Sequence, residues 1–268
     1  MIHVITLSWN GEEKLNALAP KLFDNLRESG EEWHWYIKDN GSKDNTTSMF
    51  EDRGDVTIFD YGHNRDNFAK GMNWLAEKAQ PNDGDLILLL NNDVVFNEDL
   101  AIKKMVDLQK NSGCDIVGAR LFYTDTTKLQ HAGVIFSQKY NMMPFHYRHK
   151  DEVDEPTSKN RYFQAVTAAV CLVSAKAFKE VNGFHEGYNW SFEDIDLCLK
   201  IGQRKKDNVI YCGNTNIFHE ESASLAKNPV NKMFVGPNVS LFKSQWEGKY
   251  MEDLDYYLKA PNYRVYEG

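Results

Sequence analysis

The sequence lacks any apolar run approaching the roughly 20 residues that a membrane-spanning helix needs. Cysteines are few: Cys114, Cys171, Cys198 and Cys212 are widely spaced, and none forms a CxxC pair. This spacing favours reduced thiols over a disulfide framework or a zinc site. The N-terminal residues MIHVITLSWNG also lack the basic flank and long apolar core of a signal peptide. We therefore expect a soluble, cytoplasmic protein that would reach a lipid-linked substrate only by peripheral docking at the inner membrane face.

An excess of positive charge is absent as well. The 268 residues include 31 Lys and Arg against 39 Asp and Glu, which gives a formal net charge of −8. Surfaces that bind nucleic acid normally carry clustered Lys and Arg, so this balance argues against a nucleic-acid partner. The share of hydrophobic residues, 42%, is typical of globular proteins. A chain of this length can form one large α/β domain or two small ones.

The stretch LILLLNNDVVF, residues 86–96, contains the longest uninterrupted aliphatic run before a polar cluster. Five aliphatic residues in succession predict a strand that is buried on both faces of a parallel sheet. Asn91-Asn92-Asp93 would then emerge at the carboxyl edge, where open α/β folds bind their ligands. An ordinary Asn-Asn-Asp turn is the alternative. This stretch alone does not separate the two.

The first hundred residues alternate between strand and helix patterns. We predict strands at 2–8, 33–38, 56–59 and 86–90, a helix at 12–29 that Pro20 kinks or delays, and a helix after a polar segment at 63–73. Such a βαβ series implies a parallel sheet. The polar residues after these strands, Trp9-Asn10, Asp39-Asn40 and Asn91-Asn92-Asp93, should therefore converge at one edge of the sheet.

The second half of the chain is less regular. We predict strands at 116–122, 133–136, 163–174 and 209–211, and helices at 99–111, 176–181, 189–203 and 232–246, the first capped near Asn97 or Asp99. Residues 140–156 predict an exposed loop. The cluster of His131, His146, Arg148 and His149 has no metal-ligand spacing, and we expect it to be solvated or to lie on a loop over a substrate.

The order of six motifs is more informative than any one of them. They are SWNG, DNGSKD, HNRDNFAKGMN, NND, GFHEGYNWSFEDIDLCLK and HEESAS. In this order they resemble glycosyltransferase family 2 in its rhamnosyltransferase-like branch, over roughly residues 2–246. The resemblance implies an α/β GT-A fold with a Rossmann-like, mostly parallel central sheet flanked by helices. It also implies one domain over 1–246, with a nucleotide-sugar half at 1–112, an acceptor half at 113–246, and a C-terminal extension at 247–268.

The family's reaction is transfer of a sugar, with inversion, from a nucleoside diphosphate donor to an acceptor hydroxyl, here of a saccharide or glycan. Asp39 matches the carboxylate that family members use on the base or ribose, and an Asx-turn is its alternative role. Asp66 stands where the family usually has glycine. The residues implied to bind the nucleotide sugar are Ser8, Asn10, Asp39, Asn40, Asn64, Arg65, Asn67, Lys70, Asn73, Asn91 and Asn92.

Two residues match the family's metal ligands. Asp93 ends the Asp-x-Asp motif, whose first place is taken here by Asn91, and His219 matches the C-terminal histidine. One carboxylate and one imidazole, completed by waters and diphosphate oxygens, suit Mn²⁺ or Mg²⁺. The alternative for a lone histidine is a structural role.

An inverting transfer needs a general base, and Asp194 matches the family's base position. Asp196 would point roughly 200° away on a helix, so it cannot share that role. Glu193 would contact the acceptor or orient a neighbour, although all three acids could simply favour a helix start. Trp190 would stack on an acceptor sugar or pack in the core, and Ala168 lies in a small-residue stretch that would leave room for the acceptor.

Two other functions remain open at this stage. One is a nucleotide-sugar-binding or carbohydrate-binding protein that has lost catalysis, for which Asn91 and Asp66 are the suspicious departures. The other is a glycosyltransferase that acts on modified nucleic-acid bases, which the acidic net charge disfavours.

Overall fold

A single large sheet runs through the molecule in the computed structural model, which describes residues 1–62, 66–124, 126–189, 191–220 and 235–268. The strands of the first half are β1 (Ile2–Ser8), β2 (Trp33–Asp39), β3 (Val56–Asp60), β4 (Leu86–Leu90) and β5 (Val94–Phe96). They alternate with helices α1 (Glu12–Glu28), α2 (Phe68–Ala79) and α3 (Ala101–Ser112), and with the 3₁₀ turn η1 (Asn45–Ser48).

The second half adds strands β6 (Ile116–Tyr123), β7 (Leu129–His131), β10 (Arg161–Tyr162), β11 (Val170–Ser174) and β12 (Val209–His219) to this sheet. Strands β8 (Val134–Phe136) and β9 (Pro144–His146) form a separate hairpin, with the 3₁₀ turn η2 (Gln138–Tyr140) between them. The helices are α4 (Glu155–Ser158), α5 (Ala175–Glu180), α6 (Glu193–Gly202), α8 (Val235–Trp246) and α9 (Leu254–Lys259).

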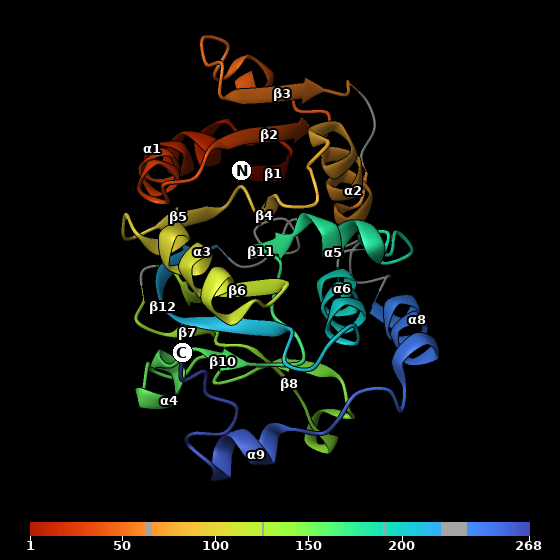
Figure 1. Ribbon diagram of the computed structural model, residues 1–268. Helices are drawn as coiled ribbons and strands as arrows, with labels where there is room; N and C mark the ends of the chain where they lie inside the picture. Colours follow the sequence, from red (N-terminus) through yellow and green to blue (C-terminus); the bar gives the residue numbers. More distant parts are fainter. Residues whose placement is uncertain (63–65, 125, 190, 221–234) are drawn as a thin grey trace.

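The sheet has the order β10-β12-β6-β11-β4-β1-β2-β3. Its first-half strands β3, β2, β1 and β4 are all parallel, as the βαβ pattern predicts. Strand β11 then runs antiparallel to both β4 and β6, while β12 is parallel to β6. The expected class, an α/β protein with a helix-flanked central sheet, is what the structure has, and the direction of the strands changes only beyond β4 (Figure 1).

Strand β4 is buried on both faces, as its unbroken aliphatic run predicts. Leu86, Leu88 and Leu90 belong to the hydrophobic core under α1 and α3, whereas Ile87 and Leu89 belong to the core that includes α2, α5 and α6. All five side chains are at most 8% exposed. The strand therefore separates two cores, and its position within the sheet is well defined because every side chain packs.

The buried strand β4 ends at Leu90, where the polar residues begin, as the sequence predicts. Asn92 and Asp93 form a turn after β4, and β5 leaves the parallel ladder to pair antiparallel with β12. The reason is that three consecutive polar side chains cannot continue a strand that is buried on both faces. The predicted strand at 163–174 is shorter than expected, because residues 163–169 are not in a strand and β11 begins at Val170.

Three other local predictions were wrong in detail. Helix α1 begins at Glu12 and continues through Pro20, so the proline does not delay it. Helix α3 is capped by Leu100, while Asp99 instead pairs with Lys21. The segment 140–156 contains β9 and the start of α4, and its Tyr147 is only 2% exposed, so it is not simply an exposed loop.

The C-terminal residues 247–268 pack onto the second half of the chain. Tyr257 is buried and its hydroxyl donates to the Tyr162 carbonyl at 2.6 Å. Asp253 is also buried and accepts a hydrogen bond from the Phe136 amide at 2.8 Å, and burial raises the pKa of its carboxyl to about 6. The boundaries placed at residues 112 and 246 remain predictions.

Across the described ranges, every helix is too short or too polar to cross a membrane.

Helix α1 is tied to the connection between β5 and α3 by Asn25, which is fully buried. Its side-chain nitrogen donates to the Glu98 carbonyl at 2.6 Å and to the Lys21 carbonyl at 2.9 Å. Its oxygen accepts from the Ile102 amide at 3.3 Å. These hydrogen bonds hold the chain that follows β5, from Glu98 to Ile102, against α1 and so help to place β5.

We predict that Asn25→Ala lowers the free energy of unfolding by about 1–3 kcal/mol, because it leaves buried backbone groups unpaired. Urea denaturation measures the loss. The matched control is Asn111→Ala on the exposed side of α3, which should change stability by less than about 0.5 kcal/mol. Equal effects of the two substitutions would contradict the role given to Asn25.

Candidate functional site

Asp93 and His219 meet at one corner of the sheet because β5 pairs with β12. The His219 Nε2 atom lies 3.2 Å from Asp93 Oδ1 and 3.1 Å from Asn91 Nδ2. The Glu220 amide donates to the Asp93 carbonyl at 3.0 Å, which continues the pairing of the two strands past His219. The two residues predicted to bind metal are thus neighbours, although they are far apart in the sequence.

Lys14 of α1 lies on the other side of the same carboxylate. Its ammonium is 3.3 Å from Asp93 Oδ2 and 3.7 Å from Glu220 Oε2. Burial opposes ionisation of Asp93, but the hydrogen bond and charge of His219 and the charge of Lys14 outweigh it and hold the pKa of this carboxyl below its usual range. Asp93 is therefore an anion that lies between the Lys14 ammonium and the His219 ring. The sequence patterns did not single out Lys14, because one lysine on a helix carries no motif.

The residues able to hold a metal ion are few. In the described part of the chain, no three His, Cys, Asp or Glu side chains form a cluster that could bind one. The corner offers Asp93 and His219, with the Asn91 amide beside them. An oxygen and a nitrogen ligand at this spacing match the donor set expected from the sequence.

The histidine of this corner is held by a residue that the sequence analysis missed. Gln130 of β7 accepts a hydrogen bond from His219 Nδ1 at 2.7 Å and donates to the His219 carbonyl at 3.1 Å. The short strand β7 was not predicted, and LQH has no pattern that distinguishes it from a loop.

The carboxyl ends of β1, β2 and β4 converge as expected. The Ser8 hydroxyl accepts from Asn92 at 3.0 Å, joining β1 to the turn after β4. The Asn10 side chain accepts from the Lys43 amide at 2.8 Å, joining β1 to the turn after β2. Polar residues from three separate strand ends therefore form one connected edge, which is the edge where a ligand is expected.

Asp39 forms the Asx-turn that was considered as its alternative role. One carboxylate oxygen accepts from the Gly41 and Ser42 amides at 3.0 and 2.9 Å, and the other accepts from the Ser42 hydroxyl. The carboxylate is 1% exposed. A contact of Asp39 with a base or ribose remains a prediction. Such a contact would need a carboxylate lone pair that the three donors from Gly41 and Ser42 do not use.

The unexpected Asp66 is neutralised by a buried lysine. Lys38 of β2 is fully buried, forms an ion pair with Asp66, and lies 4.4 Å from the ring centroid of Tyr61 and 5.0 Å from that of Trp74. The Asn40 side chain accepts a hydrogen bond from the Asp66 amide at 2.8 Å and donates one to the Asp66 carbonyl at 2.9 Å. Asp66 thus has a structural partner within this chain. Asn64 and Arg65, which precede it, lie outside the described residues.

Asn67, at the start of α2, and Asn73, within α2, form hydrogen bonds with other parts of this chain. Asn67 caps α2 by accepting from the Lys70 amide at 2.9 Å, and it donates to the Tyr188 carbonyl at 3.0 Å. Asn73 exchanges two hydrogen bonds of 2.9 Å with the Phe184 backbone. Both side chains tie α2 to the segment that precedes α6. Lys70 itself is exposed on α2.

The same segment is held from the opposite side by Asn238 of α8, which is 1% exposed. It donates to the Asn189 carbonyl at 2.7 Å and to the Ser191 hydroxyl at 2.9 Å. The sequence analysis did not identify Asn238. Three buried or partly buried asparagines thus anchor residues 184–191, and Trp190 within that range lies outside the described residues.

Asp194 lies in the first turn of α6 and faces the backbone of residues 167–169. Its Oδ2 accepts from the Ala168 amide at 3.2 Å, and its Oδ1 accepts from the Ile195 amide at 2.8 Å. The next residue, Ala169, accepts at its carbonyl from the Asn91 amide at 2.9 Å. The predicted base and the Asn-Asn-Asp turn are therefore joined through two consecutive alanines.

Burial raises the pKa of Asp194, because it disfavours the charged carboxylate more than the two amide donors stabilise it. Glu193 is 9% exposed, and burial and the neighbouring Asp194 charge raise the pKa of its carboxyl as well. Among the described atoms, Glu193 Oε2 has no hydrogen-bond partner. Two adjacent carboxyls with raised pKa values in one place are typical of a functional site.

Asp196 points into the core instead. It is fully buried, accepts from Trp246 Nε1 at 2.8 Å, and pairs with Lys200 at 2.6 Å. Its direction agrees with the helical angle expected from the two-residue spacing.

One residue of the histidine cluster, His131, is not solvated as expected, whereas His146, Arg148 and His149 are partly exposed. His131 is fully buried, with Nε2 3.4 Å from the Thr167 amide and Nδ1 2.8 Å from His146 Nδ1. His149 lies 2.5 Å from the Tyr123 hydroxyl. Burial lowers the pKa of His131 well below its usual value, so this imidazole is neutral. Through His131 the cluster contacts Thr167, the residue before the Ala168 amide that binds Asp194.

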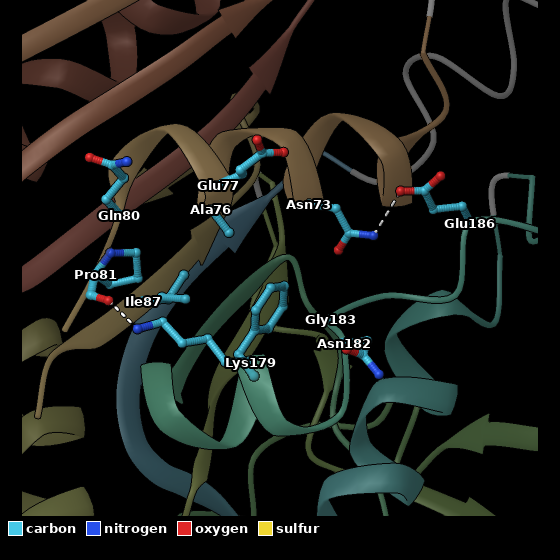
Figure 2. A pocket seen from close by; sticks show the side chains of 11 residues that line it. Asn73, Ala76, Glu77, Gln80, Pro81, Ile87, Lys179, Asn182, Gly183 and Glu186 are labelled. Carbon is cyan, nitrogen blue, oxygen red and sulfur yellow. Dashed lines mark hydrogen bonds between the residues drawn. The ribbon is translucent and has the colours of Figure 1, made fainter. Parts of the chain in front are cut away.

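A cavity of about 670 Å³ lies away from this edge, between α2 and α5 (Figure 2). Ile87, near the start of β4, and Pro81, after α2, line it, and Lys179 reaches across to the Pro81 carbonyl. Asn73 and its partner Glu186 lie at one end. Asn73 is the sole predicted site residue in its lining, so this cavity is not where Asp93, His219 and Asp194 meet.

Comparison with known proteins places the chain in context. The model of the family described as "Glycosyl transferase family 2" matches residues 4–166. O-antigen biosynthesis protein RfbC of Myxococcus xanthus is 27% identical over 162 residues, which is 59% of this chain and 12% of RfbC. Rhamnosyltransferase WbbL of Escherichia coli K12 is 24% identical over 212 residues, which is 75% of this chain and 76% of WbbL.

Among solved structures, GalNAc-T7 with UDP, GalNAc and Mn²⁺ superposes with a TM-score of 0.59 at 11% identity, over 98% of this chain and 54% of that one. At this identity the likeness concerns the fold. The chain spans less than a fifth of the length of the curated relatives that it matches first.

We predict that Asp196→Ala lowers the free energy of unfolding by about 1–3 kcal/mol, because it leaves the buried Trp246 N–H without an acceptor. Asp194→Ala, the same change two residues earlier, removes an acceptor from the Ala168 and Ile195 amides but also removes a carboxylate whose charge burial disfavours, and because these effects oppose each other it should lower the free energy of unfolding by less than about 1 kcal/mol. Urea denaturation of the two variants compares them directly. Equal losses would show that Asp194 is structural too.

Proposed function

The chain belongs to glycosyl transferase family 2, and from this premise we propose that it is a glycosyltransferase that moves a sugar, with inversion, from a nucleoside diphosphate to a hydroxyl of a saccharide or glycan. The family resemblance of the motif order is thereby confirmed, and the relatives are consistent with the rhamnosyltransferase-like branch. The α/β GT-A fold is confirmed as well, because glycosyltransferases are the structural neighbours.

One observation carries the proposal: the Ala168-Ala169 backbone bonds Asp194 on one side and Asn91 on the other. A base for the acceptor and an anion-neutralising corner for the leaving group must lie on either side of the anomeric carbon. The link through two alanines keeps the two groups close without filling the space with side chains. Ala168 is 5% exposed, and its methyl group is the smallest that a chiral residue can present to an acceptor.

The base role follows from the geometry and charge of Asp194. Its carboxylate would take the proton of the acceptor hydroxyl while that oxygen bonds to the anomeric carbon and the bond from this carbon to the diphosphate breaks. A raised pKa makes the carboxylate a better proton acceptor than an exposed aspartate. Glu193, with its pKa also raised, would stay protonated and donate a hydrogen bond to the acceptor or to Asp194.

Asp93 and His219 would hold Mn²⁺ or Mg²⁺ at the other side of the reaction. The residues fit such an ion, because the histidine presents the nitrogen that Gln130 does not bind toward the carboxylate. When bound, the cation would neutralise the charge that develops on the diphosphate leaving group. Lys14, already against Asp93, adds a second positive charge on the same side.

The donor would bind along the edge formed by the ends of β1, β2 and β4, through Ser8, Asn10, Asp39, Asn40 and Asn92. GalNAc-T7, which shares the fold, was crystallised with UDP and Mn²⁺, and this supports a nucleotide and a divalent ion at such an edge. The names of RfbC and WbbL support a glycan product. We retain a cytoplasmic location, with peripheral docking for a lipid-linked acceptor, as part of the proposal.

We predict that Asp194→Asn lowers kcat by about 10²–10⁴, because the amide cannot accept the proton. Its melting temperature and its affinity for the nucleotide should stay unchanged. In the wild type, the activity should fall as the pH drops through the pKa of Asp194, at a pH higher than an exposed aspartate with its pKa of about 3.9 would give.

The control for this measurement is Asp99→Asn, which removes an exposed carboxylate paired with Lys21 and should leave kcat unchanged. Unchanged turnover by Asp194→Asn would remove Asp194 as the base. A wild-type protein that neither transfers nor hydrolyses any nucleotide sugar with Mn²⁺ present would instead favour a binding protein without catalysis.

A thermal-shift screen with UDP, GDP and dTDP, each with and without Mn²⁺, tests the donor edge. One nucleotide should raise the melting temperature, because a ligand present at 100 times its Kd stabilises the native state by about 2.7 kcal/mol. Asp93→Asn should abolish the part of the shift that depends on Mn²⁺. Glu220→Gln is the control: it removes an exposed carboxylate that, like Asp93, lies near Lys14, and it should keep the shift that depends on Mn²⁺. If no nucleotide shifts the melting temperature, the donor site assigned here is wrong.

A further inference from the structure

Strand β7 is three residues long and entirely buried. It pairs antiparallel with β6, with Leu121 opposite His131 and Phe122 opposite Leu129. Two consecutive residues of β6 thus face residues of β7 that are two apart, and Gln130 is the extra residue between them. A bulge of this kind leaves the extra residue without a partner in the ladder and redirects its side chain.

The redirected side chain of Gln130 binds one residue twice. Its Oε1 lies 2.7 Å from His219 Nδ1, and its Nε2 lies 3.1 Å from the His219 carbonyl oxygen. Gln130 is 4% exposed, so water does not compete with either contact. Because both ends of the Gln130 amide bind His219, one at the ring and one at the backbone carbonyl, Gln130 fixes the orientation of the ring relative to the backbone.

The two contacts also determine which nitrogen of His219 carries the proton. The His219 carbonyl can only accept a hydrogen bond, so the NH₂ end of Gln130 must face it. The Oε1 end then faces Nδ1, and because this oxygen can only accept, Nδ1 must carry the hydrogen. The opposite amide orientation would bring two acceptors together at the carbonyl, which excludes it.

With Nδ1–H bound to Gln130, the protonated ring of His219 donates Nε2–H to Asp93, which is the hydrogen bond that lowers the pKa of that carboxyl, whereas the neutral ring leaves a lone pair on Nε2. That atom lies 3.2 Å from Asp93 Oδ1 and 3.1 Å from Asn91 Nδ2. The Asn91 contact is compatible with this tautomer, since its NH₂ group can donate to the lone pair. The lone pair is therefore aimed into the corner formed by Asp93 and Asn91.

We propose that Gln130 is a positioning residue, which holds His219 in the Nδ1-protonated tautomer so that Nε2 is free to bind a divalent cation beside Asp93. The metal-binding role of this tautomer rests on the proposed function, because that role requires a cation beside Asp93. The tautomer itself does not depend on the cation. Neighbours of a metal-binding histidine commonly fix its ring in this way, and their loss typically weakens metal binding about 10–100-fold.

The first test uses the metal-free protein. Long-range ¹H–¹⁵N NMR spectra of the histidine rings distinguish the two tautomers, and His219→Asn identifies the His219 signals by their loss. The wild type should show Nδ1 protonated, and Gln130→Met should show Nε2 protonated in part of the molecules. A wild-type His219 that is protonated on Nε2 when neutral, or an unchanged tautomer in Gln130→Met, would overturn the proposal.

Gln130→Glu is the conservative variant: it keeps an acceptor for Nδ1, replaces the donor to the His219 carbonyl by a second oxygen, and adds a negative charge beside the ring. It should keep the Nδ1-protonated tautomer, and it serves as the test if Gln130→Met does not fold. A shift to the Nε2-protonated form in a folded Gln130→Glu would overturn the proposal. Gln203→Met, at an exposed position after α6, is the matched control and should change nothing.

The second test is titration with Mn²⁺ followed by electron paramagnetic resonance. Gln130→Met should bind Mn²⁺ about 10–100-fold more weakly than the wild type, and Gln130→Glu should recover most of the affinity. Equal Mn²⁺ affinity in the wild type and Gln130→Met would remove the positioning role. If the wild type binds no Mn²⁺ but shows the expected tautomer, the metal role of His219 fails while the hold of Gln130 on its ring stands.

Discussion

The antiparallel pairing of β5 with β12 is the contact on which the candidate site depends. It sets Val94 opposite His219, and so brings the residue before Val94, Asp93, to within 3.2 Å of the histidine ring. Strand β5 can make this pairing only because the chain turns out of the parallel ladder at Asn92 and Asp93. A buried aliphatic strand that ends in three polar residues therefore has two effects: it builds the core, and it delivers a carboxylate to the edge.

A second constraint joins Asp194 to the turn after β4. The segment 167–169 bonds Asp194 and Asn91 through its backbone, and His131 supports it from below at Thr167. Backbone contacts of this kind hold the distance between the groups but leave the intervening space to small side chains. The segment was predicted as a strand, and its departure from strand geometry is what makes its amides and carbonyls available to the site.

Several asparagines that the motifs assign to the donor prove to be framework residues as well. Asn67 and Asn73 bind the segment ahead of α6, as does Asn238, which no motif singles out, so the three position Asp194 from α2 and α8. An asparagine side chain uses the same NH₂ and C=O groups to bind either the protein backbone or a ligand. The local sequence does not reveal which of the two partners it binds. The Lys38–Asp66 pair shows the same principle, since a departure from the family pattern is balanced by a charge on another strand.

The sequence by itself determined the parallel first half of the sheet, the doubly buried strand β4, and the family, because these depend on local periodicity and on the order of short motifs. It also identified Asp93, Asp194 and His219 as the residues to examine. Only the tertiary structure decided which groups surround them. The bulge that presents Gln130, the turn that sends β5 to β12, and the ammonium of Lys14 against Asp93 all depend on contacts between distant segments. Strand order and register decide such contacts, and neither is encoded in the residues on either side of a motif.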